Sequence, residues 1–443
     1  MIEISQLNLS NFRCFPAAEI DFGKITLITG ANSSGKSSIM YALLGLLQSS
    51  GFPFTYSTNG EYVDMGDFYE MAFLHDVRKE IGIGLRIRDG IREYDIHLKL
   101  INPDGGGIPV VKEFECHDSY FYLKLIGDVK GGHFMFDLDY DPKKNPDKYD
   151  EKLIDSILKD DTIEKGLTDD FVLIIRAFSK EFHLREEHFD ANAQEDIKDE
   201  KLIVLFKVIN EVTRVFRRFD EKFNFISSYR MPPERTYLER SVGKKIAPSG
   251  QGFVDILLKW RNSDPQRFER IISIMRSLKV LNDIQVERMK GGRFNVLVKS
   301  EETSPFASLS DVGFGVSQIL PIVMADVELG DESTLYTAQP EIHLHPSVQA
   351  DFASYAMEQA ITSKKRYVIE THSEYLLNRI RLGIVQGHIS EEEVKVYYLQ
   401  QDNGITRIYQ LFFKGNGQII GAPEDFFQTY MMDVMNIAIE AAE

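Results

Sequence analysis

Cysteine is scarce in this sequence, which contains only Cys14 and Cys116 among its 443 residues. Two thiols can form at most one disulfide bond, and these two lack the close, paired spacing of a zinc site. A disulfide-stapled secreted scaffold and a cysteine-bound metal centre are therefore not expected. We expect both cysteines to be buried thiols.

Long hydrophobic runs are also missing. The longest apolar stretches, such as residues 313–325, fall well short of the roughly 20 residues that span a bilayer. The N-terminus does not show the basic segment followed by an apolar one that is typical of a secretory leader. We therefore expect a cytoplasmic protein with no membrane partner.

Positive charge is in deficit. The chain has 51 Lys and Arg against 68 Asp and Glu, a formal net charge of −17. Such a surface repels phosphates, so binding of nucleic acid through the general surface is not favoured. One basic cluster occurs at residues 214–218, where helical spacing would put Arg214 and Arg218 on one face. Two interpretations stay open for it: a local basic patch, or a solvated helix face that pairs with acidic neighbours.

In contrast to these absences, residues 30–37 spell the pattern G-x-x-x-x-G-K-S. The apolar run 25–28 precedes them and the segment 39–44 follows, which predicts a strand, a phosphate-binding loop and a helix. Glycines let the backbone wrap an anion, and the start of a helix offers unpaired N–H groups. The lysine would contact the β- and γ-phosphates and the serine hydroxyl would ligate Mg²⁺, so we expect ATP and Mg²⁺ as cofactors. The residues expected to bind nucleotide are Gly30, Asn32, Ser33, Ser34, Gly35, Lys36, Ser37 and Ser38, with Ser37 as the metal ligand.

The hydrophobic patterns divide the chain into three parts. Residues 1–140 contain apolar residues in period-two alternation, separated by turns, which predicts an N-terminal ATPase lobe with an antiparallel sheet. Residues 141–223 are acidic and helix-favouring, and we expect an inserted helical subdomain there. Residues 224–443 alternate helices with apolar strands, as a parallel sheet built from crossovers would. The predicted fold class is α/β.

Several further segments bear on the chemistry of the phosphate loop. Residues 335–346 read LYTAQPEIHLHP, residues 310–318 read SDVGFGVSQ, residues 371–373 read THS, and residues 11–15 read NFRCF. Together with the phosphate loop, they resemble motifs of the SMC/RecF/OLD-like branch of ABC ATPases. The chain is most similar to a prokaryotic group with the pattern P-E-x-H-L-H-P, T-H-S-E and a C-terminal P-x-x-F-F, here residues 423–427. Several members of that group act in anti-phage defence.

The resemblance implies an ABC-type P-loop ATPase head with a parallel sheet core, an antiparallel subdomain and a helical insertion. In this class the lysine and Mg²⁺ hold the phosphates, a polar residue orients water and a histidine senses the γ-phosphate. The signature loop of one copy contacts the γ-phosphate held by a second copy, which implies a homodimer or higher homo-oligomer that sandwiches ATP. The residues implicated are Lys36, Gln339, Glu341 and His372 for catalysis, Gly313, Gly315 and Ser317 for the signature in trans, and Arg13 for the nucleotide, while Arg230 and Arg235 are candidates for contacts with phosphate or the partner.

The sequence departs from its relatives at the end of the strand predicted before residue 339. Ala338 stands where the family usually has an acidic residue that holds Mg²⁺, and Gln339 occupies the position of the catalytic glutamate. Alanine offers no carboxylate, so either hydrolysis is slowed or Glu341 or another acid substitutes. His343 and His345 would point the same way in an extended chain, but two histidines without a third ligand make a poor zinc site.

A second departure concerns the C-terminal segment. OLD nucleases continue into a metal-dependent nuclease domain, whereas only about seventy residues follow Glu374 here and they contain no D-x-D cluster. The resemblance therefore implies an ATP-dependent switch that controls a separately encoded effector, a nuclease or toxin, upon detecting a phage trigger protein. One alternative is a RecF- or SMC-like DNA repair or maintenance ATPase that clamps DNA, which the acidic charge does not favour. Another is a scaffold that uses ATP only as a structural ligand.

Overall fold

The computed structural model describes residues 1–103, 107–128, 133–140, 184–186, 199–240, 243, 245–423 and 426. These residues form two compact units, each built from two stretches of the chain. The first unit comprises residues 1–20 and 38–220, and the second comprises residues 21–37 and 221–443. Most of the predicted helical insertion, residues 141–183 and 187–198, lies outside the described residues, as do residues 424, 425 and 427 of the C-terminal motif.

The first unit contains an eight-stranded sheet in the order β2-β1-β4-β5-β6-β7-β8-β9. From β1 to β8 each neighbouring pair is antiparallel, and β9 is parallel to β8. The strands are β1 (Ile2–Phe12), β2 (Phe15–Asp21), β4 (Ile81–Asp89), β5 (Arg92–Ile101), β6 (Val110–His117), β7 (Phe121–Asp128), β8 (His133–Tyr140) and β9 (Leu184–Glu186). The antiparallel sheet predicted within residues 1–140 is therefore present.

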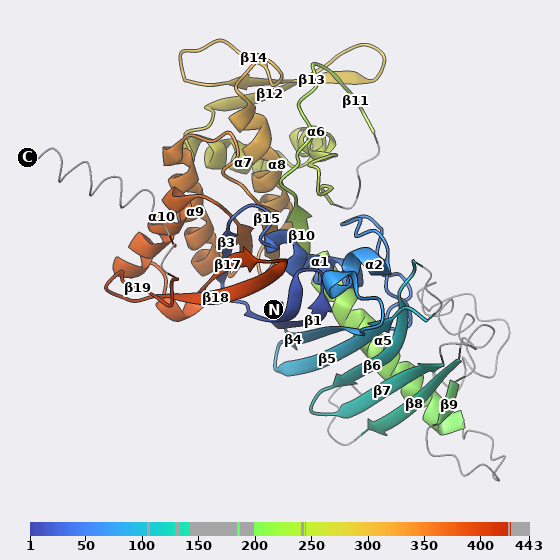
Figure 1. The fold of residues 1–443 in the computed structure, drawn as a ribbon. Coiled ribbons are helices and arrows are strands. Elements are labelled where there is room, and N and C mark those ends of the chain that lie inside the picture. Colours follow the sequence, from blue (N-terminus) through green and yellow to red (C-terminus); the bar gives the residue numbers. More distant parts are fainter. Residues whose placement is uncertain are drawn as a thin grey trace, which may run out of the picture. The chain divides into compact units, whose positions relative to one another are not determined.

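One long helix, α5 (Asp199–Glu221), packs on this sheet (Figure 1). Glu211 of α5 is buried and accepts hydrogen bonds from the Arg92 guanidinium and, at 2.9 Å, from the Tyr94 hydroxyl of β5. In the basic cluster of α5, Arg214 pairs with Glu211, and Arg218 pairs with Asp89. These contacts support the interpretation as a helix face that pairs with acidic neighbours. Among its described residues, the unit also contains the body of α1 (Lys36–Leu47), α2 (Phe68–Met71) and η1 (Phe73–His75).

The second unit is built on a seven-stranded sheet in the order β10-β15-β16-β3-β17-β18-β19. The first five strands are parallel, and the last two are antiparallel. Their bounds are β3 (Ile25–Gly30), β10 (Phe223–Ile226), β15 (Thr334–Ala338), β16 (Arg366–Glu370), β17 (Val394–Asp402), β18 (Ile405–Phe413) and β19 (Ile419–Ile420). The carboxyl ends of β15, β16 and β3 thus lie side by side, which is where open parallel sheets bind ligands.

Helices connect and cover these strands. They are α6 (Phe253–Ser263), α7 (Pro265–Ser277), α8 (Phe314–Leu329), α9 (Pro346–Thr362), α10 (Glu374–Val385) and η2 (Glu391–Glu393). A small sheet of β11 (Tyr237–Leu238), β13 (Arg293–Lys299) and β12 (Asp283–Arg288), with β14 (Ala307–Ser308) on β13, completes the unit.

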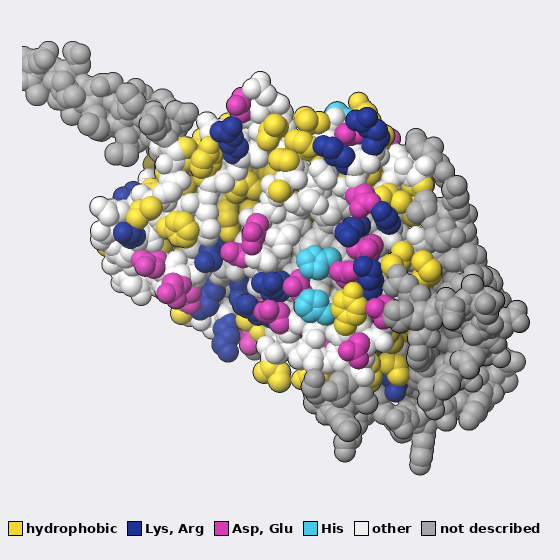
Figure 2. All heavy atoms as spheres, turned by 60° about the horizontal axis from the view of Figure 1, so that its bottom comes forward, with side chains coloured by type: hydrophobic (Ala, Val, Ile, Leu, Met, Phe, Trp, Pro, Cys, Tyr) yellow, Lys and Arg dark blue, Asp and Glu magenta, His cyan; other side chains and the backbone are white. Residues whose placement is uncertain are grey.

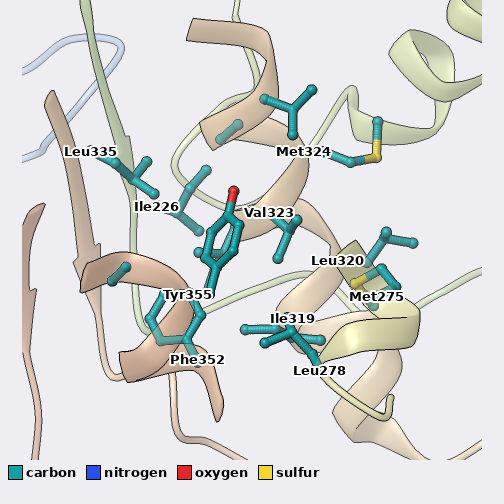
Figure 3. Close-up of a cluster of buried hydrophobic side chains, with 14 of the residues drawn as sticks. Ile226, Met275, Leu278, Ile319, Leu320, Val323, Met324, Leu335, Phe352 and Tyr355 are labelled. Atoms are coloured by element: carbon teal, nitrogen blue, oxygen red, sulfur yellow. The ribbon is translucent and has the colours of Figure 1, made fainter. Parts of the chain in front are cut away.

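The core of the second unit surrounds α8, which is apolar on all sides and is buried, as such helices usually are. Figure 3 shows its side chains meeting those of α7, α9, β10 and β15. Ile319, Leu320 and Val323 are fully buried there. Burying each such side chain contributes roughly 1.5–3 kcal/mol. This packing holds the start of α8 in a defined place relative to the end of β15.

Two smaller expectations can be compared with the structure. Cys116 is a buried thiol, as expected, whereas Cys14 is only partly buried, and neither cysteine forms a disulfide. Among the described residues, no helix combines the length and the apolar character needed to cross a bilayer.

Candidate functional site

The phosphate loop connects β3 to α1, as its sequence predicts. Gly30 has a φ of +143°, and a Cβ there would lie 2.2 Å from the carbonyl oxygen of Leu399, so only glycine fits. Gly35 has a φ of +93°, and the non-glycine Ser33 has a φ of 61°. Backbone in this region costs free energy and is often found at ligand-binding loops. Gly30 and Gly35 adopt these conformations without strain, so Ser33 is the residue of the three that bears it.

The expected nucleotide-binding residues of this loop differ in exposure. Asn32 and Ser33 are exposed, and Ser34 is buried, with its backbone carbonyl accepting from the Thr406 hydroxyl at 2.9 Å. The Ser34 hydroxyl is buried without a partner. Ser38 is half-buried and falls in the first unit, as does Arg13, whose guanidinium lies 4.9 Å from the Tyr41 ring centroid.

Lys36 is buried and folds back over its own loop. Its Nζ donates to the carbonyl oxygens of Ala31 at 2.7 Å and Gly30 at 3.2 Å. Desolvation lowers the pKa of this ammonium, and the charges of Glu370 and Glu341 partly oppose the shift. Carbonyl oxygens are weaker partners for an ammonium than anionic phosphate oxygens. The lysine is thus held where it can exchange these carbonyls for a bound anion.

Glu370, the last residue of β16, is the residue that sequence reasoning missed. Its Oε2 accepts from the Ser37 hydroxyl at 2.8 Å, and it is 1% exposed. Its Oε1 is buried with no hydrogen-bond partner. Desolvation raises the pKa of the carboxyl to about 7, against the influence of Ser37 and Lys36. The available signal was an acid that ends an apolar strand directly before residues 371–373.

The end of β15 lies beside Glu370. Ala338 pairs with Glu370 in the parallel register, and the Gln339 N–H donates to the Glu370 carbonyl oxygen at 2.7 Å. Gln339 has a φ of 49°, a conformation that few non-glycine residues adopt. The proposed water-orienting residue therefore sits at a sharp turn where the chain leaves the sheet.

Glu341 and His372 meet at the same edge. The backbone N–H of His372 donates to Glu341 Oε1 at 2.7 Å, while Glu341 Oε2 is buried with no hydrogen-bond partner. Desolvation raises the pKa of Glu341. Desolvation and then the charge of Lys36 lower the pKa of His372, which a hydrogen bond to the Gly30 backbone partly opposes. The structure therefore brings Lys36, Ser37, Gln339, Glu341 and His372 together at one sheet edge.

The three signature residues lie at or in the first turns of α8. Gly313 is exposed and caps the helix, and a Cβ on it would meet nothing within 4 Å. At Gly315 a Cβ would lie 2.8 Å from the carbonyl oxygen of His343, so glycine allows α8 to approach the turn after β15. Ser317 is 2% exposed, and its hydroxyl donates to the Phe314 carbonyl oxygen. Its hydroxyl is thus used inside the helix rather than presented at the surface.

Arg230 and Arg235 have partners that the sequence did not indicate. Arg230 is buried and donates to the backbone carbonyls of Ser227, Ala338 and Gln339 and to the Gln318 side chain. Desolvation lowers its pKa to about 10. Arg235 forms a two-bond ion pair with Asp311 on the surface. Arg230 therefore braces the site from inside, and Arg235 is engaged by an acid of its own chain.

Residues 2–377 match the family described as the AAA ATPase domain. The chain belongs to this family. The described residues include a phosphate loop between β3 and α1 and an α/β fold, as an AAA ATPase requires. No protein of curated function matches the chain.

Solved structures of SMC heads also match this AAA ATPase. The SMC head domain from Thermotoga maritima is 11% identical with a TM-score of 0.41, covering 92% of this chain and 98% of its own. The Smc head domain from Pyrococcus furiosus, with an extended coiled coil and bound to the C-terminal domain of ScpA, is 12% identical with a TM-score of 0.44, covering both chains fully. An SmcHead bound to the C-winged helix domain of ScpA is 13% identical with a TM-score of 0.41, covering 93% of this chain and 98% of its own.

The donor set of the AAA ATPase site fits Mg²⁺. This ion takes oxygen ligands, and nucleotide sites usually supply one or two protein ligands beside the phosphates and water. The Ser37 hydroxyl and the Glu370 carboxylate provide such a pair. Of the two histidines after the turn, His345 caps α9, where its Nδ1 accepts from the Ser347 N–H at 3.3 Å. Among the described residues, no group of three or more His, Cys, Asp or Glu has a metal-binding arrangement.

Proposed function

We propose that this ATPase is a nucleotide-dependent switch in which Mg-ATP joins two copies of the chain. The P-loop of one copy holds the phosphates, and the start of α8 in a second copy contacts them. The observation that carries the proposal is the exposed start of α8. A helix N-terminus favours an anion through its free N–H groups and its dipole. Here that terminus begins at the exposed Gly313 and is held against the turn that follows β15.

The surface beside this helix start also favours a partner. Phe314 is 58% exposed, and its ring centroid lies 5.7 Å from that of His343. Burial of a large exposed apolar side chain by a second surface is favourable. A twofold pair would cover Phe314 of both copies, because each copy offers both halves of the interface.

The finer role is control of a separately encoded effector, a nuclease or toxin, in anti-phage defence. In this proposal the ATP-bound pair holds the effector, a phage trigger changes the state of the pair, and hydrolysis resets it. The support is the sequence resemblance, which is an analogy rather than a property of the site.

The alternative function, a DNA clamp, would need a continuous basic surface. On the face drawn in Figure 2, the Lys and Arg side chains of the described residues are instead interspersed with Asp and Glu.

Analytical ultracentrifugation with a non-hydrolysable ATP analogue tests the switch. We expect the wild type to shift from one copy to a pair or larger assembly when the analogue and Mg²⁺ are added. Lys36→Ala should abolish both nucleotide binding and the shift. Gly313→Glu should retain nucleotide binding but lose the shift, because a carboxylate at the helix start repels the phosphates. A wild type that binds the analogue and keeps the mass of one copy would contradict the proposal.

The effector role needs a separate experiment. The chain would be co-expressed with the products of its neighbouring reading frames, and a stable complex with a nuclease or toxin would support it. Steeply salt-dependent binding of duplex DNA by the ATP-bound pair would support the clamp instead.

A further inference from the structure

The sheet edge that holds the phosphate loop lacks a carboxylate on one strand and has one on the next. β15 ends in Ala338, which is 3% exposed and offers only a methyl group. Its partner in the parallel register of β16 is Glu370. Side chains of paired residues in neighbouring strands point to the same face, about 4.8 Å apart. The small side chain of Ala338 therefore lies beside the buried carboxylate of Glu370.

The two oxygens of this carboxylate have different partners. Oε2 accepts the hydrogen of the Ser37 hydroxyl at 2.8 Å, so it contacts the P-loop side chain that ligates Mg²⁺ in this class of site. Oε1 is buried and has no partner among the described residues. A buried carboxylate oxygen without a partner costs free energy. A bound ligand that contacts Oε1 would account for the absence of a protein partner for this atom.

Glu341, the acid nearest to the missing position in sequence, is engaged differently. Its Oε1 is occupied by the N–H of His372 at 2.7 Å, and its carboxylate interacts with the charge of Arg230. The Ser37 hydroxyl donates to Glu370 instead. Of these two glutamates, Glu370 is therefore the one that shares a contact with the expected metal ligand.

We propose that Glu370 supplies the protein carboxylate that holds Mg²⁺ at the ATP site, directly or through a bound water, in place of an acid at position 338. This inference rests on the proposed binding of Mg-ATP at the P-loop. The metal-binding carboxylate of this site would then come from the end of β16 instead of the end of β15. Ala338 then leaves room beside Glu370 instead of marking a defective site.

Calorimetric titration of ATP in the presence of Mg²⁺ and in EDTA tests this role without relying on turnover. For the wild type we expect Mg²⁺ to tighten ATP binding. In Glu370→Gln the Mg²⁺-dependent gain should fall about 10- to 100-fold, the range for loss of a group that supports a metal ligand. The affinity measured in EDTA should change little, because glutamine keeps the shape of the glutamate side chain and can still accept from Ser37.

Two control variants separate this role from a structural one. Glu328→Gln changes another carboxylate with one buried, unpartnered oxygen, at the far end of α8 from Gly313, and should keep the full Mg²⁺ gain. The double variant Ala338→Glu/Glu370→Gln returns an acid to β15 and should recover most of the gain. If the role of Glu370 were purely structural, Glu370→Gln would lower ATP affinity equally with Mg²⁺ and with EDTA. The double variant would then not restore the Mg²⁺-dependent gain selectively.

Failure of this inference is distinguishable from failure of the proposed function. If Lys36→Ala abolishes ATP binding while Glu370→Gln keeps the wild-type Mg²⁺ gain, the site binds ATP and the assignment of Glu370 is overturned. If the wild type binds no ATP in either condition, the proposed function itself fails. Circular dichroism of each variant confirms that it is folded before the titrations are compared.

Discussion

The Arg230 guanidinium donates to the carbonyl oxygen of Gln339 at 2.9 Å, at the turn where β15 leaves the sheet. The same side chain donates to the Gln318 side chain of α8 at 3.1 Å. One buried cation thus links the turn that carries the catalytic candidates to the helix that carries the signature residues. This link adds to the close approach of Gly315 in α8 to the His343 backbone in the same turn.

The first prediction follows from that link. Arg230→Met should lower the free energy of unfolding of the second unit by about 3–5 kcal/mol, because the carbonyls of Ala338 and Gln339 lose a buried, charged donor. Trp260, the single tryptophan of the chain, is buried in this unit and reports its unfolding in a urea titration. Arg235→Met removes an exposed ion pair with Asp311 and should cost less than about 1 kcal/mol. Equal losses in the two variants would contradict the bracing role.

The second prediction concerns the approach of α8 to the turn after β15. Gly315→Ala should destabilise the second unit by about 1–2 kcal/mol, because the new Cβ would lie 2.8 Å from the backbone oxygen of His343 and the helix must shift. Gly313→Ala is the matched control, since its Cβ meets nothing within 4 Å and it should show only the loss of a good N-cap residue, about 0.5–1 kcal/mol. Trp260 fluorescence in urea, without nucleotide, compares the two. A stable Gly315→Ala variant would show that the contact is loose.

The third prediction concerns the position where the family usually has an acid. Ala338→Glu alone should not raise ATP turnover more than about twofold and should lower stability, because it places a second buried carboxylate beside Glu370. Two buried carboxylates on paired residues of adjacent strands cannot both ionise without a cost in free energy. Phosphate release at saturating ATP and Mg²⁺ measures turnover. A large increase would show instead that the wild-type site lacks a functional acid and that hydrolysis is slowed for that reason.

The P-loop was predictable because its chemistry is contiguous in sequence. Glycines, lysine and serine occupy fixed positions in residues 30–37, and the flanking strand and helix are readable from local patterns. Glu370 was not, because its partner Ser37 lies 333 residues away and only the pairing of β16 with β3 brings them together. The partners of Arg230 are mostly backbone carbonyls, which carry no residue-specific signal. The sequence thus predicted the loop and the order of motifs, while the contacts that join them depend on strand order.

The last prediction is a pH dependence of stability caused by Glu328 on α8. Desolvation raises the pKa of this carboxyl from its ordinary value of 4.5 to about 7, and Lys259, Arg267 and Lys245 only partly oppose the shift. A folded state with a raised carboxyl pKa binds more protons than the unfolded state between these two values. The stability that this group contributes is therefore fully present below pH 4.5 and is lost as the pH rises through 7.

Glu328→Gln removes this titration. Between pH 4.5 and 7.5 the wild type should lose about 1–2 kcal/mol of unfolding free energy relative to the variant, an amount reduced from the full shift because the side chain is partly accessible to solvent. Urea titrations followed by Trp260 fluorescence at each pH measure the difference. Glu358→Gln, an exposed glutamate on α9, should follow the wild-type profile. If the Glu328→Gln profile is parallel to that of the wild type, ionisation of Glu328 does not destabilise the fold, and its carboxylate must be compensated by the neighbouring cations.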